Sequence, residues 1–183
     1  MTDETTLSSS PAPAAEHEPV ASRRDFVAAA VTVAAAAGAV AAPAQAQTSP
    51  VRRANPPGMA TPATYSQVVE VNGPHRVVYL AGQTAQNADG KPTPSDIRGQ
   101  ATQIMENIKT ALASVGGGFE HIVKLNTYMV NIDRDGPGYR EVRASYFKDK
   151  SALPASTLLQ ISRLASPDYL LEVEVQAILP PRA

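Results

Sequence analysis

The C-terminal segment 170–179 alternates between apolar and polar side chains, and this pattern restricts the fold more than any other. Leu171, Val173 and Val175 would lie on one side of a strand, and Glu172 and Glu174 would lie on the other. A strand of this kind belongs to a sheet that packs through one face only. The second face of that sheet is then either solvated or buried against another subunit.

The remaining patterns supply further strands and two helices. Strands are predicted over 65–71, 75–81, 122–130 and 157–163, with the first two joined as a hairpin through Asn72-Gly73-Pro74. One helix is predicted from an N-cap at Ser95 to a stop at 116–118, and a second after Pro137. The order β-β-α-β-α-β-β predicts an α+β sandwich, a mixed sheet with both helices on one face. Apolar residues would make part of the other face able to associate: Val77, Tyr79, Leu159 and Ile161.

An export signal is predicted at the N-terminus. Arg23 and Arg24 form a twin-arginine pattern, an alanine-dominated run follows over 26–44, and the triplet 44–46 offers an A-x-A cleavage site. We therefore expect a signal peptide over 1–46, the twin-arginine translocase as a partner, and a periplasmic protein. An uncleaved N-terminal anchor is the alternative, but the run is weakly hydrophobic, which favours a protein without stable membrane association.

Cleavage after Ala46 would leave one domain. The remaining 137 of 183 residues hold 14 of the 16 basic and 12 of the 17 acidic side chains, a net charge near +2. The basic residues are scattered, so no nucleic-acid partner is expected. Residues 47–64 are rich in proline and are predicted to be a mostly irregular lead-in to a domain over 65–180. The chain has no cysteine, and its histidines show no metal-ligand spacing.

A set of short segments, taken in order, resembles one known family. They are Tyr65-Ser66-Gln67, Ala81-Gly82-Gln83, Asp96-Ile97-Arg98-Gly99-Gln100-Ala101, Glu106-Asn107-Ile108, Ile122-Val123-Lys124-Leu125, Pro154-Ala155-Ser156-Thr157, Ser162-Arg163-Leu164 and Leu171-Glu172-Val173-Glu174-Val175. Together they resemble the RidA/YjgF family, the reactive-intermediate (imine/enamine) deaminases. The resemblance extends over nearly all of the predicted domain.

The resemblance implies a fold, an assembly and a chemistry. The fold would be the chorismate-mutase-like sandwich, and the assembly would be a homotrimer whose sheets form a central barrel. Three sites would lie in the clefts between subunits and bind a small-molecule substrate. The reaction would be hydrolysis of 2-imino or 2-enamino acids to 2-keto acids and ammonia, without a metal or organic cofactor.

Three family site residues have counterparts here, and two do not. By the resemblance, Tyr65 is the pocket tyrosine, Gly82 lines the site with its backbone, and Glu172 positions or activates the attacking water. Ser156 occupies the place of the family's carboxylate-binding arginine, and Arg140 occupies the place of a pocket asparagine. A serine hydroxyl offers one neutral donor where a guanidinium offers a charged fork.

The loss of that arginine leaves several interpretations open. Arg140 or Arg143 could reach the pocket from the second helix and compensate, or both could be solvated. The expected function is a deaminase-like hydrolase for a small imine, enamine or related metabolite, with free 2-imino acids in doubt. The alternative is a non-catalytic trimer that binds a small ligand in the same cleft. A structural or chaperone-like trimer is a third interpretation.

Overall fold

The computed structural model describes residues 50–92 and 96–182, which lie in one compact unit. The predicted signal peptide lies outside these residues, so export stays a prediction. The predicted N-cap at Ser95 is wrong, because the helix is capped by Asp96, whose side chain accepts a hydrogen bond from the Gly99 N–H at 3.0 Å. Within the described ranges, no helix has the length and apolarity needed to cross a membrane.

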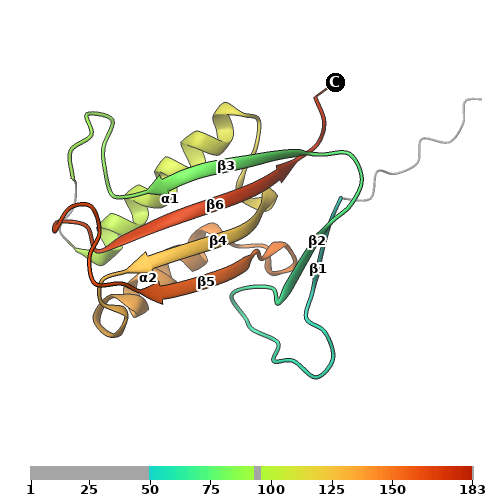
Figure 1. The fold of residues 1–183 in the computed structure, drawn as a ribbon, viewed down its shortest axis with the longest axis horizontal. Helices are drawn as coiled ribbons and strands as arrows, with labels where there is room; N and C mark the ends of the chain where they lie inside the picture. Colours follow the sequence, from blue (N-terminus) through green and yellow to red (C-terminus); the bar gives the residue numbers. More distant parts are fainter. Residues whose placement is uncertain (1–49, 93–95, 183) are drawn as a thin grey trace, which may run out of the picture. The chain divides into compact units, whose positions relative to one another are not determined.

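A mixed four-stranded sheet forms the centre of the domain (Figure 1). Its strands are β3 (Arg76–Gln83), β4 (Ile122–Met129), β5 (Ala155–Gln160) and β6 (Leu171–Leu179), in the order β3-β6-β4-β5. Strand β6 is antiparallel to both neighbours, whereas β4 and β5 are parallel. A parallel pair needs a crossover connection, and a helix between β4 and β5 supplies it.

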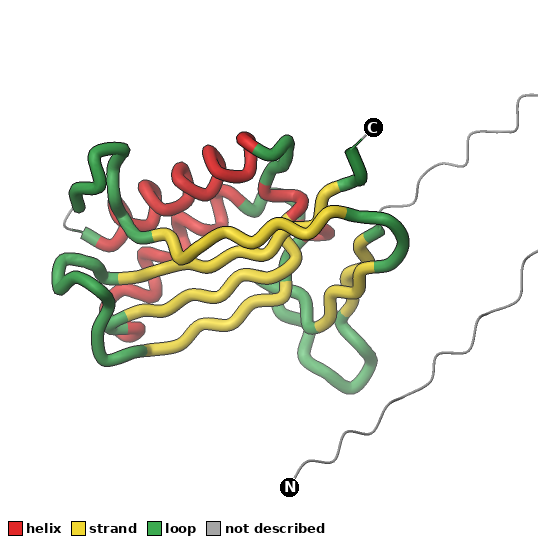
Figure 2. The backbone as a smooth tube through the Cα atoms, turned by 45° about the horizontal axis from the view of Figure 1, so that its top comes forward, coloured by secondary structure: helices red, strands yellow, loops and turns green. Residues whose placement is uncertain are grey.

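Two helices, α1 (Ile97–Ser114) and α2 (Ile132–Tyr146), cover the same face of this sheet (Figure 2). Two short 3-10 helices, Phe119–His121 and Lys150–Ala152, precede β4 and β5. The core lies between the layers, where Ile104, Ile108 and Leu112 of α1 are fully buried together with Leu125 and Val173 of the sheet. The predicted sandwich with both helices on one face is confirmed.

Strands β1 (Val51–Ala54) and β2 (Val68–Val71) form a separate antiparallel pair. The predicted hairpin between the first two strands is therefore wrong, because β2 pairs with β1 while β3 pairs with β6. The 47–64 lead-in, predicted to be mostly irregular, supplies β1. Gly73 turns the chain between β2 and β3 with a φ of +75°, so the turn exists without joining paired strands.

Helix α2 begins earlier than its proline suggested. Asn131 caps it by accepting a hydrogen bond from the Arg134 backbone N–H at 2.9 Å, and Gln160 Oε1 accepts one from the Ile132 N–H at 3.0 Å. These two acceptors satisfy donors of the first turn, so the helix starts at Ile132 and contains Pro137. The predicted start after Pro137 is wrong because side-chain capping decides where this helix begins.

The end of α1 follows the prediction. The Gly116 N–H bonds to Ala113 at 3.0 Å, the Gly117 N–H bonds to Leu112 at 2.8 Å, and Gly116 has a φ of +81°. This is a glycine-dependent helix stop that returns the chain to the sheet. Strand β5 begins two residues before its predicted start, because Ala155 and Ser156 already pair with Lys124 and Leu125.

Candidate functional site

Glu172 and Gly82 lie against each other on the face of the sheet that the helices leave open. The pairing of β3 with β6 is irregular between Leu80 and Gln83, and a Cβ added at Gly82 would overlap with the Glu172 carboxylate. A side chain at position 82 would displace the Glu172 carboxylate from this position. Such an irregularity commonly redirects a side chain at the edge of a sheet. Glu172 is half-buried, and among the described residues nothing donates a hydrogen bond to its carboxylate. It is therefore free to hold a water molecule.

Its neighbour Glu174 is held in place. Tyr128 donates to Glu174 Oε2 at 2.9 Å, and Asn126 approaches the same oxygen at 3.4 Å. The hydrogen bond to Glu174, with the nearby charge of Glu172 adding to it, raises the pKa of Tyr128. Glu174 is thus paired across the sheet, and the two glutamates of one strand have different surroundings.

A shallow pocket of about 160 Å³ lies on this open face next to Glu174. Lys124 lines it and donates to Thr157 Oγ1 at 2.7 Å, so its ammonium is fixed over the sheet. The remaining lining residues come from β3, β4 and β6: Tyr79, Leu80, Asn126, Glu174, Val175 and Gln176. The polar surface near Glu172 therefore continues along the open face.

Tyr65 and Ser156 lie near each other at a different corner. Ser66 donates through its hydroxyl to Leu153 O at 2.8 Å and through its N–H to Pro154 O at 2.9 Å. These bonds hold Tyr65 beside the chain that leads into Ser156. The register pairs Ser156 with the fully buried Leu125, so its side chain lies on the helix-covered face.

The predicted site residues therefore form two groups within one chain. Glu172 of β6 pairs with Tyr128 of β4, and Tyr128 pairs in turn with Leu159 of β5. Ser156 lies three residues before Leu159 on the same strand. Glu172 and Ser156 are therefore separated by two strand spacings, about 10 Å, and by three residues along the strand, about another 10 Å. Their side chains also lie on opposite faces of the sheet. A single copy of the chain does not bring Glu172 and Ser156 together.

The two arginines considered for compensation have opposite environments on α2. Arg140 is exposed, and its guanidinium folds back over Gly136 of the same helix. Arg143 is only 7% exposed, donates from Nη1 to Thr64 O at 2.7 Å, and lies with its guanidinium carbon 4.8 Å from the Phe147 ring centroid. Burial lowers the pKa of Arg143, which Tyr139 partly opposes.

Arg140 is not brought to the other predicted site residues, and its binding role stays a prediction. Arg143 reaches the residue next to Tyr65. A sequence signal for this was available, because Arg143 follows the buried Tyr139 by four positions and so shares its helix face.

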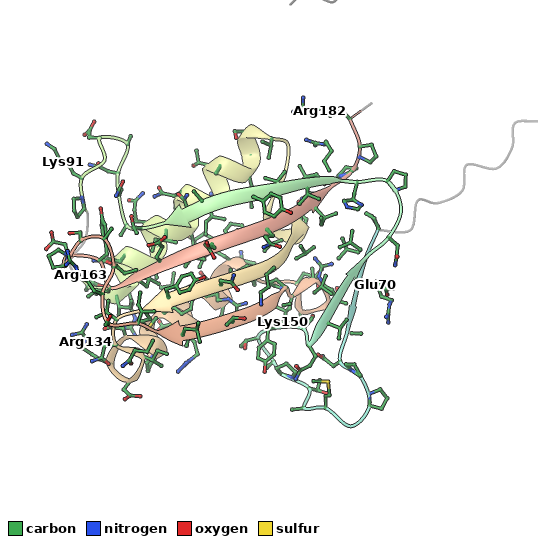
Figure 3. All side chains as sticks on the ribbon, viewed as in Figure 1. Glu70, Lys91, Arg134, Lys150, Arg163 and Arg182 are labelled. Atoms are coloured by element: carbon green, nitrogen blue, oxygen red, sulfur yellow. The ribbon has the colours of Figure 1, made fainter. Side chains whose placement is uncertain are left out.

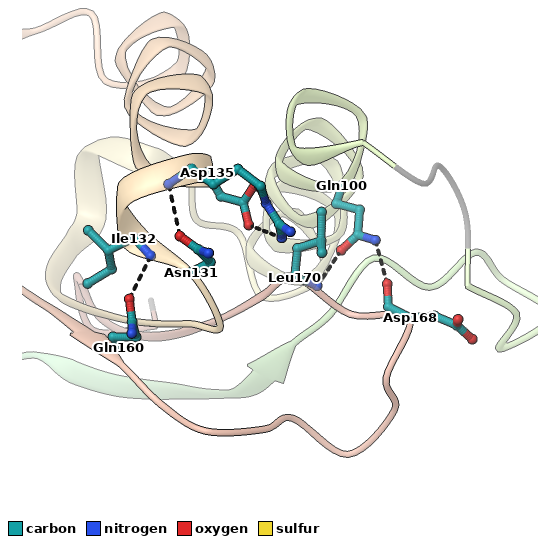
Figure 4. Close-up of polar contacts among 8 residues, drawn as sticks. Gln100, Asn131, Ile132, Asp135, Gln160, Asp168 and Leu170 are labelled. Atoms are coloured by element: carbon teal, nitrogen blue, oxygen red, sulfur yellow. Dashed lines mark hydrogen bonds and ion pairs between the residues drawn. The ribbon is translucent and has the colours of Figure 1, made fainter.

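Two side-chain amides of α1 position the strand ends that carry Gly82 and Glu172. The sequence patterns did not predict either of them as a site residue. Gln100 is 1% exposed, donates to Asp168 O at 2.7 Å and accepts from the Leu170 N–H at 2.9 Å, just before Glu172 (Figure 4). Asn107 donates to the backbone oxygens of Thr84 and Gln86 at 3.3 and 3.0 Å, just after β3. Both lie in segments of the family resemblance.

Several charged side chains lie around the rim of the sheet when it is viewed from its open face. Figure 3 labels Lys91, Arg163 and Arg134 along the left side of the domain. In the parts of the chain that are described, no cluster of three or more histidine, aspartate or glutamate side chains could hold a metal ion. The concentrated polar chemistry of the open face is thus that of Glu172, Glu174, Tyr128, Asn126 and Lys124.

Comparison with protein families assigns the chain. The family model described as Endoribonuclease L-PSP matches residues 56–179, about two thirds of the sequence. The chain belongs to this family, the RidA/YjgF family. The family predicted from the ordered segments is therefore confirmed.

Individual relatives agree with this assignment. A RutC family protein of Pyrococcus abyssi is 31% identical over 114 residues, which are 62% of this chain and 84% of the relative. A protein of Escherichia coli, TdcF, named as a candidate reactive intermediate deaminase, is 27% identical over 123 residues, which are 67% of this chain and 90% of TdcF.

Solved structures show the same fold. The Rid family protein YyfB of Yersinia pestis, whose function is given as unknown, superposes with a TM-score of 0.65 at 28% identity. The match covers 71% of this chain and 99% of YyfB. Yeast Mmf1 gives a TM-score of 0.53 at 28% identity, over 66% of this chain and 90% of Mmf1.

Proposed function

We propose that this protein hydrolyses a small imine, enamine or related metabolite in a site formed between two copies of the chain. The observation that carries the proposal is the Glu172 carboxylate, which has no hydrogen-bond donor among the described residues and lies against Gly82 on the open face. Family membership supports the same chemistry, as does the name of the relative TdcF.

The reaction needs one base and one place for water. Glu172 would take a proton from water as the oxygen attacks the carbon of the C=N bond, which gives a tetrahedral carbinolamine. That proton passes to the nitrogen. Glu172 then takes the remaining hydroxyl proton and passes it to the nitrogen as the C–N bond breaks, so ammonia leaves and the carbonyl product remains. One water is consumed and one ammonia released, and Glu172 ends in its starting state.

The separation of the two groups of residues supports a site between subunits. Glu172 and Gly82 lie on one face, whereas Tyr65 and Ser156 lie at the other corner, so a second copy is needed to unite them. The open face also carries exposed apolar side chains suited to association, Val77, Tyr79 and Leu159. We propose the homotrimer implied by the family resemblance as this assembly.

One observation favours the alternative of a non-catalytic ligand-binding trimer. Ser156 lacks the charged fork that would hold a substrate carboxylate, so a free 2-imino acid would be held weakly at that position. A protein that has the cleft but no arginine to hold a substrate carboxylate could bind a ligand without converting it to product.

The test is hydrolysis of freshly generated 2-iminobutanoate by the full 183-residue chain, compared with the Glu172→Gln variant. Loss of the base should lower the rate by about 100-fold or more, since general-base catalysis contributes on the order of 10²–10⁴. Glu174→Gln is the matched control, because it changes a carboxylate on the same strand and face that is already paired.

The outcomes separate the two functions. Ammonia release by the wild type and by Glu174→Gln, but not by Glu172→Gln, supports the hydrolase. A wild type that is stabilised against heat by small acids but releases no ammonia supports the ligand-binding alternative, because specific ligands raise the melting temperature by mass action.

A further inference from the structure

Arg143 is a buried charge whose hydrogen bonding is incomplete within the described part of the chain. Its Nη1 is anchored by Thr64 O at 2.7 Å, and its guanidinium packs on the Phe147 ring. Its Nε and Nη2 are buried and have no hydrogen-bond partner in residues 50–92 and 96–182. Buried charges in proteins are normally paired, because removing them from water is costly.

The two unpaired atoms lie on the same edge of the guanidinium. This edge is the one that binds a carboxylate side-on through two parallel hydrogen bonds. The same chain shows this pairing elsewhere, where Arg134 Nε and Nη2 donate to the two Asp135 oxygens at 2.8 and 2.7 Å. Arg143 thus presents an unpaired fork of the shape that fits a carboxylate.

No carboxylate of the described residues serves this fork. Tyr139 is the one group found to interact electrostatically with Arg143 there, and it is a phenol. Arg53 provides a contrast, because it also has a buried unpaired Nε but lies within the electrostatic range of Asp149. The counter-charge for Arg143 therefore has to come from outside these residues.

The fork lies at the Tyr65 and Ser156 corner. Thr64, which anchors Arg143, immediately precedes Tyr65. Tyr139, one helical turn before Arg143, shares a 2.7 Å hydrogen bond with Thr127 on the helix-covered face of β4. One turn further along α2 brings Arg143 toward the level of the neighbouring β4–β5 pair, Leu125 and Ser156.

We infer that Arg143 binds the carboxylate of a small acid ligand through Nε and Nη2, and so supplies from helix α2 the clamp that Ser156 lacks. The inference rests on the proposed function in naming a 2-imino acid or its 2-keto product as that ligand. Both donor atoms are covered in the single chain, so binding requires the Thr64–Ser66 segment or an adjacent side chain to shift.

The test measures binding of 2-oxobutanoate to the full chain by calorimetry, with 2-butanone as a probe that replaces the carboxylate by a methyl group. The wild type should bind the acid and not the ketone. Arg143→Met should bind the acid about 10- to 100-fold more weakly, because two charge-assisted hydrogen bonds are lost. Arg143→Lys keeps the charge without the fork and should also weaken binding.

Control variants distinguish the clamp from a general effect. Arg98→Met removes an exposed arginine of α1 and should leave binding unchanged. Adding Ser156→Arg to Arg143→Met should restore binding, since it returns the fork to the strand.

The inference is overturned if the wild type does not bind 2-oxobutanoate, if Arg143→Met binds it as tightly as the wild type, or if Arg140→Met loses binding instead. Hydrolysis of 2-iminobutanoate is measured on the same variants. Binding through Arg143 without ammonia release would support the role of Arg143 in ligand binding and contradict the proposed hydrolase activity. Ammonia release that is unchanged in Arg143→Met would support the hydrolase activity and contradict the role of Arg143 in ligand binding.

Discussion

The two faces of the central sheet use the same strands for different ends. On the helix-covered face, Leu171 and Val173 of β6 are fully buried, and the chain completes this core alone. On the open face, Glu172 of the same strand receives no hydrogen bond from the described part of the chain, while Tyr79 of β3 is 73% exposed. Strand alternation thus separates the buried core of the subunit from the face that carries its exposed polar and apolar side chains.

The largest effect should come from removing a side chain of the covered face. Leu171→Ala should lower the free energy of unfolding by about 2–5 kcal/mol, because it deletes apolar atoms from a closed core. Gln176→Ala, on the same strand but on the open face, should change it by no more than about 0.5 kcal/mol. Urea unfolding at one protein concentration checks both, and equal losses would contradict a one-sided core.

An intermediate effect is expected for association through the open face. Tyr79→Asp places a charge where an aromatic side chain would be buried between subunits, which should weaken each interface by about 2–4 kcal/mol. Light scattering coupled to gel filtration should give three times the 19.2 kDa chain mass for the wild type and the mass of one chain for the variant. Tyr79→Phe should remain assembled. A monomeric wild type would remove the proposed role of this face.

The smallest effect concerns a polar contact between the helices of the covered layer. Burial, aided by a 2.8 Å hydrogen bond to Glu106, raises the pKa of Tyr146 to about 12. The protonated phenol therefore stabilises the folded state below about pH 10, the ordinary tyrosine value, and this stabilisation is lost as the pH rises toward 12.

Tyr146→Phe should lower the free energy of unfolding at neutral pH by less than about 1 kcal/mol, since the bond is partly exposed. The variant should also lose stability less steeply than the wild type between pH 10 and 12. Unfolding curves across that range measure the difference. Parallel pH profiles for the two proteins would show that the ionisation of Tyr146 does not affect the free energy of unfolding.

The sequence predicted the elements that depend on periodicity. Buried side chains recur about every 3.6 residues along a helix and every second residue along a strand. The spacing of Ile104, Ile108 and Leu112 and the alternation along β6 follow these two periods. Strand partners were harder, because pairing is not local. A turn at Gly73 suggested a hairpin, yet β2 pairs with a strand from the lead-in.

The candidate site was predicted in part for a similar reason. The family resemblance assigned Gly82 and Glu172 to the site, each with its own role. The structure adds their close approach, in which a Cβ at position 82 would overlap with the Glu172 carboxylate. The choice between Arg140 and Arg143 depended on which side of α2 packs inward. That orientation is set by contacts such as the bond from Arg143 to Thr64, 79 positions away in the chain.

The distance between Glu172 and Ser156 within one chain has a consequence for how such proteins diverge. Two strand spacings and the thickness of the sheet separate Glu172, the proposed base, from the corner at which we propose that the acid group of the ligand binds. A substitution at the corner leaves the geometry of Glu172 and Gly82 intact, so selection can exchange one ligand preference for another without rebuilding the reaction. On our proposal, an arginine of helix α2 performs the task that the family resemblance assigns to an arginine at position 156, while Glu172 and Gly82 keep their arrangement.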